Sequence, residues 1–360
     1  MTASIVIEEL PIPTGPDAVS FADYAHVLAV RNAHEAHVMG PAARYTDPVE
    51  ALPFFQDQAH MRHRIFAGRL DGEIVAHALL RWFTEPGARI AWAFGEVLPN
   101  ARRRGVGTAL FDHVESVVHS LGRPVIQSFA MHEAIAGGDR LPSPTGFGSL
   151  PLHDPGVRFL LRRTYELSQI QRMSLMPLPV PPAHLDALLR EAVAVASDAY
   201  DTVTWVGPTA EHWLADLAVL ISRMDTDAPR GTLVTEPEEW DAERVRTHEA
   251  RNERSGRLSL TAAAVRRATG NLAGFTQLSV PTDRTQPVRQ QSTLVLREHR
   301  GHRLGLLMKL ANIRQLQEYS PESPSIVAGN AEDNRHMLSV NETIGFVPIA
   351  YGGAWKKPLT

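Results

Sequence analysis

Hydrophobic and polar residues follow one another along this chain in two series of segments that share the same order. In the first half, residues 64–70 and 73–82 are apolar, strand-like stretches on either side of the turn signal Asp71-Gly72. This pattern predicts a β-hairpin. The second half repeats it at 257–267 and 272–280. The sequence therefore predicts one hairpin in each half.

Apolar residues at helical spacing accompany each hairpin. The predicted helical stretches are 18–38 and 108–121 in the first half, and 184–223 and 306–317 in the second. Short apolar runs at 125–130 and 325–329 predict a further strand after each later helix. The order helix, hairpin, strand, loop, helix, strand, helix, strand thus occurs twice. It indicates an α+β fold, an α/β sandwich made of two similar domains with mixed, mostly antiparallel sheets.

A proline-rich stretch separates the two series. Residues 177–182 contain four prolines, which cannot continue a helix or a central strand and favour an extended connector. A length of 360 residues suits two domains. We therefore expect an N-terminal domain at 1–176, a linker at 177–182 and a C-terminal domain at 183–360.

Composition excludes several classes of protein. A formal charge of −4 argues against nucleic acid as a partner, and no apolar run reaches the roughly 20 residues that span a membrane. The absence of cysteine removes disulfides and thiolate chemistry. The first ten residues lack the features of a signal peptide, which predicts a cytoplasmic protein. Histidine pairs three residues apart do not match the zinc-protease spacing, so we expect no metal site.

A basic, glycine-containing loop precedes the later helix in each half. Residues 97–107 read Val-Leu-Pro-Asn-Ala-Arg-Arg-Arg-Gly-Val-Gly, and residues 295–305 read Val-Leu-Arg-Glu-His-Arg-Gly-His-Arg-Leu-Gly, 198 residues further on. The first N–H groups of a helix have no internal partner, and the helix dipole favours an anion there. Glycine permits close approach and arginine adds charged hydrogen bonds. The two loops therefore predict phosphate binding.

These loops resemble the pyrophosphate-binding loop, Q/R-x-x-G-x-G/A, of the GNAT acetyltransferases. Arg102-x-x-Gly105-x-Gly107 fits this pattern, and Arg300-x-x-Arg303-x-Gly305 fits it with one departure at Arg303. The stretch ending in Gly345-Phe346 is similar to the family's last motif. The tandem layout resembles mycothiol synthase and related actinobacterial acetyltransferases.

The resemblance implies an acetyl-CoA-dependent N-acetyltransferase that acts by direct attack of an amine on the thioester. The loops would hold the pyrophosphate, and strand backbone would hold the pantetheine and polarise the thioester carbonyl. The residues implied for the cofactor are Val97, Arg102, Arg103, Arg104, Gly105, Val106, Gly107, Thr108, Val295, Arg300, Gly301, His302, Arg303, Leu304, Gly305 and Asn334.

The two halves differ where the resemblance places a catalytic base, four or six residues before the loop's valine. The first half has Ala93 and Ala91 there, and by strand alternation Glu96 points away from them. The second half has Gln291, with Thr293 nearby. This contrast predicts a catalytic C-terminal half and a non-catalytic N-terminal one, although the first loop is the intact one.

The thiol acid of the family is a tyrosine, and Asn341 occupies its position. We therefore expect Gln291, Thr293 and Asn341 at the reaction centre, with solvent as the acid. The alternative is a non-catalytic module that binds acyl-CoA as a sensor or regulator.

Carboxylates near the start of the second half suggest where a cationic acceptor would bind. Asp225 and Asp227 follow the early helical stretch, and Glu249 lies further along with His248 as a second base candidate. The expected partners are acetyl-CoA and a small-molecule amine, without nucleic acid or membrane. Either a monomer or a homodimer is compatible with the sequence.

Overall fold

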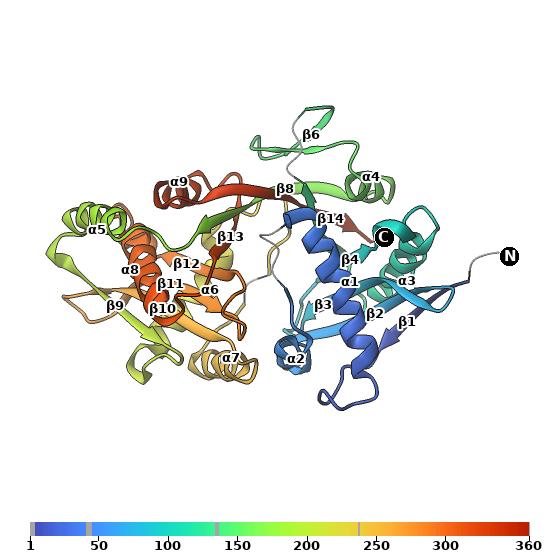
Figure 1. The fold of residues 1–360 in the computed structure, drawn as a ribbon, viewed down its shortest axis with the longest axis horizontal. Helices are drawn as coiled ribbons and strands as arrows, with labels where there is room; N and C mark the ends of the chain where they lie inside the picture. The colour runs from blue at the N-terminus through green and yellow to red at the C-terminus, as the bar shows by residue number, and fades with distance from the viewer. Residues whose placement is uncertain (1–3, 41–44, 134–136, 237, 360) are drawn as a thin grey trace.

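The computed structural model describes residues 4–40, 45–133, 137–236 and 238–359, without the side chains of Ser197 and Asp225. Twelve strands form one sheet in the order β1-β2-β3-β4-β5-β14-β8-β13-β12-β11-β10-β9, with helices on both faces. Figure 1 shows the two halves side by side, joined across the top by β8 and β14. The fold class predicted from the sequence is confirmed.

The first half contains these elements: β1 (Ile5–Leu10), α1 (Phe21–Met39), α2 (Pro48–Gln56), β2 (Met61–Leu70), β3 (Glu73–Phe83), β4 (Ile90–Val97), α3 (Val106–Ser120), β5 (Val125–Glu133), β6 (Arg140–Pro142), β7 (Ser149–Pro151), α4 (Pro155–Arg162) and β8 (Glu166–Pro177).

The second half contains α5 (Pro182–Ala196), β9 (Tyr200–Val206), α6 (Leu214–Asp227), α7 (Ala242–Arg254), β10 (Leu258–Arg266), β11 (Leu272–Val280), β12 (Val288–Val295), α8 (Leu304–Tyr319), β13 (Ser325–Ala331), α9 (Arg335–Ile344) and β14 (Val347–Pro358). A short 3-10 turn precedes each basic loop, at Pro99–Ala101 and Arg297–His299.

Both predicted hairpins are present, as β2–β3 and β10–β11. The predicted helical stretch 184–223 is wrong in its middle, where β9 interrupts it. Tyr200, Val203 and Val206 lie three residues apart, a spacing that also fits a helix, and β9 is a half-exposed edge strand with weak alternation. The sequence pattern therefore could not distinguish a strand from a helix at residues 200–206.

The last strand of the second half lies inside the sheet of the first. β14 pairs antiparallel with β5 on one side and with β8 on the other, and β8 pairs in turn with β13. Each half thus ends in a strand that also borders the other half. The C-terminus consequently lies in the first half (Figure 1).

Helices cover the two faces of the first half differently. α3 and α4 pack on the face that carries Leu80, Ala91 and Ala93. α1 and α2 pack on the opposite face against Ile65 and Ile74; this surface of β3 and β4 is called the α1 face below. In the second half, α5 and α8 share one face and α6 and α7 the other.

Ion pairs join the halves where α2 approaches α7. Arg251 pairs with Asp57 at 3.3 Å, Arg257 with Glu50 at 2.6 Å and Arg244 with Glu85 at 2.9 Å. Along the described residues, no helix has both the length and the apolarity that crossing a bilayer requires.

Candidate functional site

The two basic loops have the same backbone conformation. In the first loop, Arg103 and Gly105 have positive φ angles of 62° and 90°; in the second, Gly301 and Arg303 have 89° and 53°. Each loop therefore has left-handed residues at the same two positions, one occupied by glycine and one by arginine, in exchanged order. Arg303, the departure from the motif, preserves the shape of the loop.

Both loops leave the start of a helix uncapped. The residues that precede α3 and α8, Gly105 and Arg303, make no side-chain capping hydrogen bond. By contrast, Asp47, Asp154 and Asp241 cap α2, α4 and α7. The first N–H groups of α3 and α8 are thus available to an anion, which fits a diphosphate.

An arginine ties each loop to the strand before it. Arg102 Nε donates to the carbonyl of Val97 at 3.1 Å, and Arg300 Nε donates to that of Val295 at the same distance. These two arginines fix where the strand ends, which positions the loop above it.

The strands beside each loop diverge. β4 pairs with β5 only from Ile90 to Trp92, and β12 pairs with β13 only at Val288 and Arg289. Beyond these points one edge of each strand has no strand partner among the described residues. An extended chain of the length of pantetheine could bind such an edge through backbone hydrogen bonds.

The charges around the two loops differ. In the first, Arg104 pairs with Asp71 at 3.2 Å and both side chains are largely exposed. In the second, Asp227 is 4% exposed and pairs with Arg297 at 3.2 Å and Arg300 at 2.6 Å. The first loop therefore keeps more uncompensated positive charge.

A cluster of titratable side chains lies on the α1 face next to the first loop. His77 Nε2 and Glu96 are 2.5 Å apart, with their side chains 6% and 21% exposed. Burial alone would raise the pKa of Glu96, but the charge and hydrogen bond of His77 lower it to about 2, helped by His34 and Arg31.

His34 reaches this cluster from α1. Burial lowers its pKa, and Glu96, Arg102 and His132 also act on it electrostatically. Its Nδ1 is buried without a hydrogen-bond partner. His132 lies beside Asp154 at 2.8 Å. The lowered pKa favours the neutral form of the His34 imidazole, which lies among charged groups.

The side chains of β4 alternate between the two faces of the sheet as predicted. The polar residues lie on the α1 face, and the alanines lie on the face that α3 covers. Ala91 and Ala93 are fully buried under α3, in the apolar core. Glu96 lies on the opposite face with His77, so the polar side chains of this strand pair face α1. The sequence contained His34, His77 and Glu96, but only the register of β3 with β4 brings His77 opposite Glu96.

In the second half, a bulge alters the expected alternation. The register shifts between Thr276 and Leu278, so Gln290, rather than Gln291, shares a face with Thr293. Gln290 Nε2 donates to Thr276, which hydrogen-bonds Thr293 at 2.7 Å, and all three lie on the α8 side. Gln291 is exposed. The structure does not bring Gln291 and Thr293 together.

The two predicted asparagines have local partners. Asn341 is 1% exposed, donates to Asn330 at 2.7 Å and leaves its own Oδ1 without a partner. Asn334 caps α9 by accepting from the N–H of Met337. These hydrogen bonds do not connect either asparagine to Thr276 or Thr293.

The carboxylates predicted for the acceptor are engaged elsewhere. Asp227 neutralises the second loop, as described above. Glu249 accepts from the N–H of Thr209 and pairs with Arg246 at 2.8 Å, which ties α7 to the loop between β9 and α6. The side chain of Asp225 lies outside the described part of the chain.

Comparisons with known proteins agree with this geometry. Residues 31–130 match the model of the acetyltransferase (GNAT) family. No curated protein matches the chain significantly. A solved tandem GNAT protein from the clavulanic acid biosynthesis pathway, without acetyl-CoA, is 24% identical with a TM-score of 0.74, covering 99% of this chain and 98% of that one.

A GCN5-related N-acetyltransferase from Sphaerobacter thermophilus is 14% identical with a TM-score of 0.61, covering 98% of this chain and 95% of that one. At these identities the similarity shows a common fold. It extends over the whole chain and so includes both halves.

Proposed function

Because this chain has the fold of the tandem GNAT proteins and its residues 31–130 match the GNAT acetyltransferase family, we propose that it transfers an acyl group from acetyl-CoA to the amine of a small molecule. The observation that carries the proposal is the uncapped start of α3, behind a loop of three arginines and beside diverging strands. This arrangement suits a diphosphate followed by an extended arm.

We place the reaction in the first half, whereas the sequence pattern favoured the second. The first loop has the weaker compensation by carboxylates, and the cluster of His34, His77 and Glu96 lies beside it. The second half would support the first, since its own loop is neutralised by the buried Asp227.

In this proposal each residue has a distinct task. The N–H groups from Val106 to Thr108 hold the diphosphate, and the free edge of β4 holds the extended arm. The amine nitrogen would form a bond to the acyl carbon of the thioester while the carbon–sulfur bond breaks, and CoA would leave as a thiolate that takes a proton from solvent. His34 accepts the proton that the attacking amine loses, because a neutral imidazole is a competent base near pH 7. Glu96 and His77 hold His34 in a polar setting.

Two matched variants test both the chemistry and its location. Gly107 and Gly305 are the second residues of α3 and α8, and neither has a positive φ. A Cβ at Gly107 would lie 3.3 Å from Val97, so the neighbouring side chain must shift slightly, whereas the space at Gly305 is open. Glutamate at either position places a negative charge at the start of its helix. We expect Gly107→Glu to weaken CoA binding by at least about tenfold and to abolish acetylation, because it repels the diphosphate.

Gly305→Glu is the control, since the space around its Cβ is open. It should keep the affinity and the activity. Calorimetry measures the affinity for CoA, and an assay of the released free thiol measures the acetylation activity. The reverse result, with loss only in Gly305→Glu, would move the reaction to the second half. Absence of CoA binding to the unaltered protein would refute acyl transfer.

A further inference from the structure

Arg81 on β3 has a guanidinium group without a partner. It makes no hydrogen bond or ion pair with any residue in the described ranges, and its Nε is completely buried. The group lies over the ring of Phe94, 4.9 Å from the centroid. Burial lowers the pKa of Arg81 to about 10, and the charge of Glu238 offsets only part of this effect.

The nearest carboxylate that acts on Arg81 is committed to another arginine. Glu238, from the second half, pairs with Arg244 at 2.6 Å, and Arg244 also pairs with Glu85. Glu238 thus shares its charge between Arg244, with which it forms an ion pair, and Arg81. Arg81 has no ion-pair partner among the described residues, while Glu238 pairs with Arg244. We expect such an arrangement at a site that binds an anionic ligand.

A second guanidinium without a partner among the described residues lies on the same face. Arg31, on α1, lines a cavity of about 20 Å³ together with His77 and Leu79. It acts electrostatically on both Glu96 and Arg81. Arg31 on α1 and Arg81 on β3 therefore share this face with the carboxylate of Glu96, which His77 already contacts.

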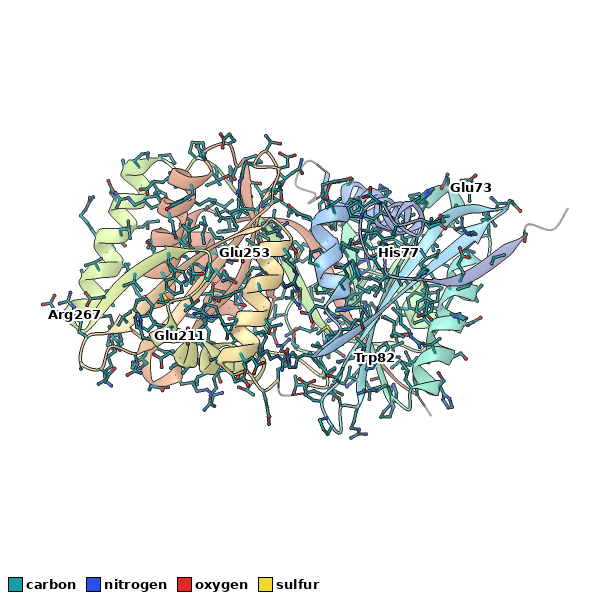
Figure 2. The ribbon with its side chains drawn as sticks, turned by 90° about the horizontal axis from the view of Figure 1, so that it is seen from below. Glu73, His77, Trp82, Glu211, Glu253 and Arg267 are labelled. Atoms are coloured by element: carbon teal, nitrogen blue, oxygen red, sulfur yellow. The ribbon has the colours of Figure 1, made fainter. Side chains whose placement is uncertain are left out.

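The position of Arg81 relates it to the proposed reaction centre. Residues 77, 79 and 81 alternate onto the α1 face, so Arg81 lies four residues from His77, about 13 Å along the strand. Figure 2 shows β3 running from Glu73 past His77 to Trp82, toward the second half. Trp92, opposite Arg81, and Phe94, opposite Leu79, stack with ring planes 6° apart and form an apolar wall.

We propose that the acceptor is an amine that also carries a carboxylate, which Arg81 binds while the amine lies beside His34 and Glu96. This inference rests on the proposed function and adds the class of acceptor to it. The N–H groups of a guanidinium match the two oxygens of a carboxylate. The aromatic pair would cover the carbon chain between the two groups.

A paired substrate series tests the inference on the full-length protein. The ω-amino acids from glycine to 6-aminohexanoate are compared with alkylamines of the same chain length, with acetyl-CoA as donor. We expect kcat/KM to be about 10- to 100-fold higher for at least one amino acid than for its alkylamine, because a charged bidentate pair is lost in the latter. O-phosphoethanolamine, compared with β-alanine, separates a carboxylate from a phosphate.

Arg81→Gln should erase this preference, raising KM for the amino acid about 10- to 100-fold. Arg64→Gln is the matched control, because Arg64 already pairs with Glu9 at 3.3 Å and lies over Trp82; its KM should not change. CoA affinity should be the same in both variants, which also shows that they fold.

The possible failures are distinguishable. No CoA binding by the unaltered protein refutes the proposed function itself. If CoA binds normally, four results refute only the carboxylate acceptor. These are equal use of amines and amino acids, acetylation of neither series, preference for the phosphate, and an unchanged KM in Arg81→Gln.

Discussion

At the scale of single residues, Arg303 and Gly105 occupy equivalent positions, each in the left-handed region just before a helix. Residues other than glycine reach this region at a cost of about 1–2 kcal/mol. The sequence shows that glycine is missing from the second loop, but it cannot show whether the loop changes shape. The structure shows that the second loop keeps the backbone conformation of the first, and that Arg303 is strained as a result.

Replacing Arg303 by glycine should therefore stabilise the protein. The ion pair that would be lost, with Glu191 at 3.6 Å, joins two half-exposed side chains and contributes little. We expect the free energy of unfolding to rise by about 1 kcal/mol, measured by denaturant titration. Arg103→Gly, at the other left-handed position, should give a similar gain. A loss of stability in both variants would show that the arginines are not strained.

At the scale of elements, the predictable parts were those with local signals. The hairpins β2–β3 and β10–β11 follow from strand-like apolar stretches and turn residues, and the basic loops follow from their glycines. The bulge in β12 has no such signal, because it depends on how Gln290 packs against α8. A shift of one residue changes which side chains share a face. The sequence placed Gln291 with Thr293, whereas in the structure Gln290 shares a face with Thr293.

The same bulge places Gln290 over a buried lysine. Lys309 on α8 is 3% exposed, donates to Gln290 at 2.9 Å, and burial lowers its pKa to about 7. Since this pKa is below that of the unfolded chain, the unfolded chain holds more protons between pH 7 and about 10. Stability from this group should therefore rise with pH over that window, by up to about 1.4 kcal/mol per pH unit.

Lys309→Met should remove this part of the slope, because methionine fills a similar volume without a charge. The free energy of unfolding at pH 7, 8 and 9 measures it. Lys356→Met is the control, since Lys356 contacts the carbonyl of Thr232 at an exposed site. If Lys309→Met kept the full slope, Lys309 would not titrate in this range.

At the scale of the whole molecule, the joining of the halves was beyond sequence reasoning. β8 and β14 each have the composition of a strand, but nothing local states that β14 should pair with β5 of the other half. Strand partners are chosen by non-local packing. The ion pairs of Arg172 on β8 with Glu332 and Glu342 reinforce this exchange, at 2.7 and 2.6 Å. The halves consequently share their central strands.

The contact between the halves should weaken in acid. His63 of β2 and His248 of α7 both lie near Arg251 and Asp57, where the halves meet, and burial followed by the neighbouring arginines lowers each pKa to about 4. The folded protein thus binds fewer protons than the unfolded chain between pH 6.5 and 4. Stability should fall as pH decreases through this window, by up to about 1.4 kcal/mol per pH unit for each histidine.

Substitution of both histidines by glutamine should flatten this dependence, because glutamine stays neutral while a protonated histidine beside Arg251 and Arg81 is repelled. Unfolding at pH 7, 6 and 5 provides the measurement, with His119→Gln as the control because it lies on the exposed end of α3, far along the chain from this contact. If the double variant and the unaltered protein lost stability in parallel, the acid sensitivity would lie outside the contact between the halves.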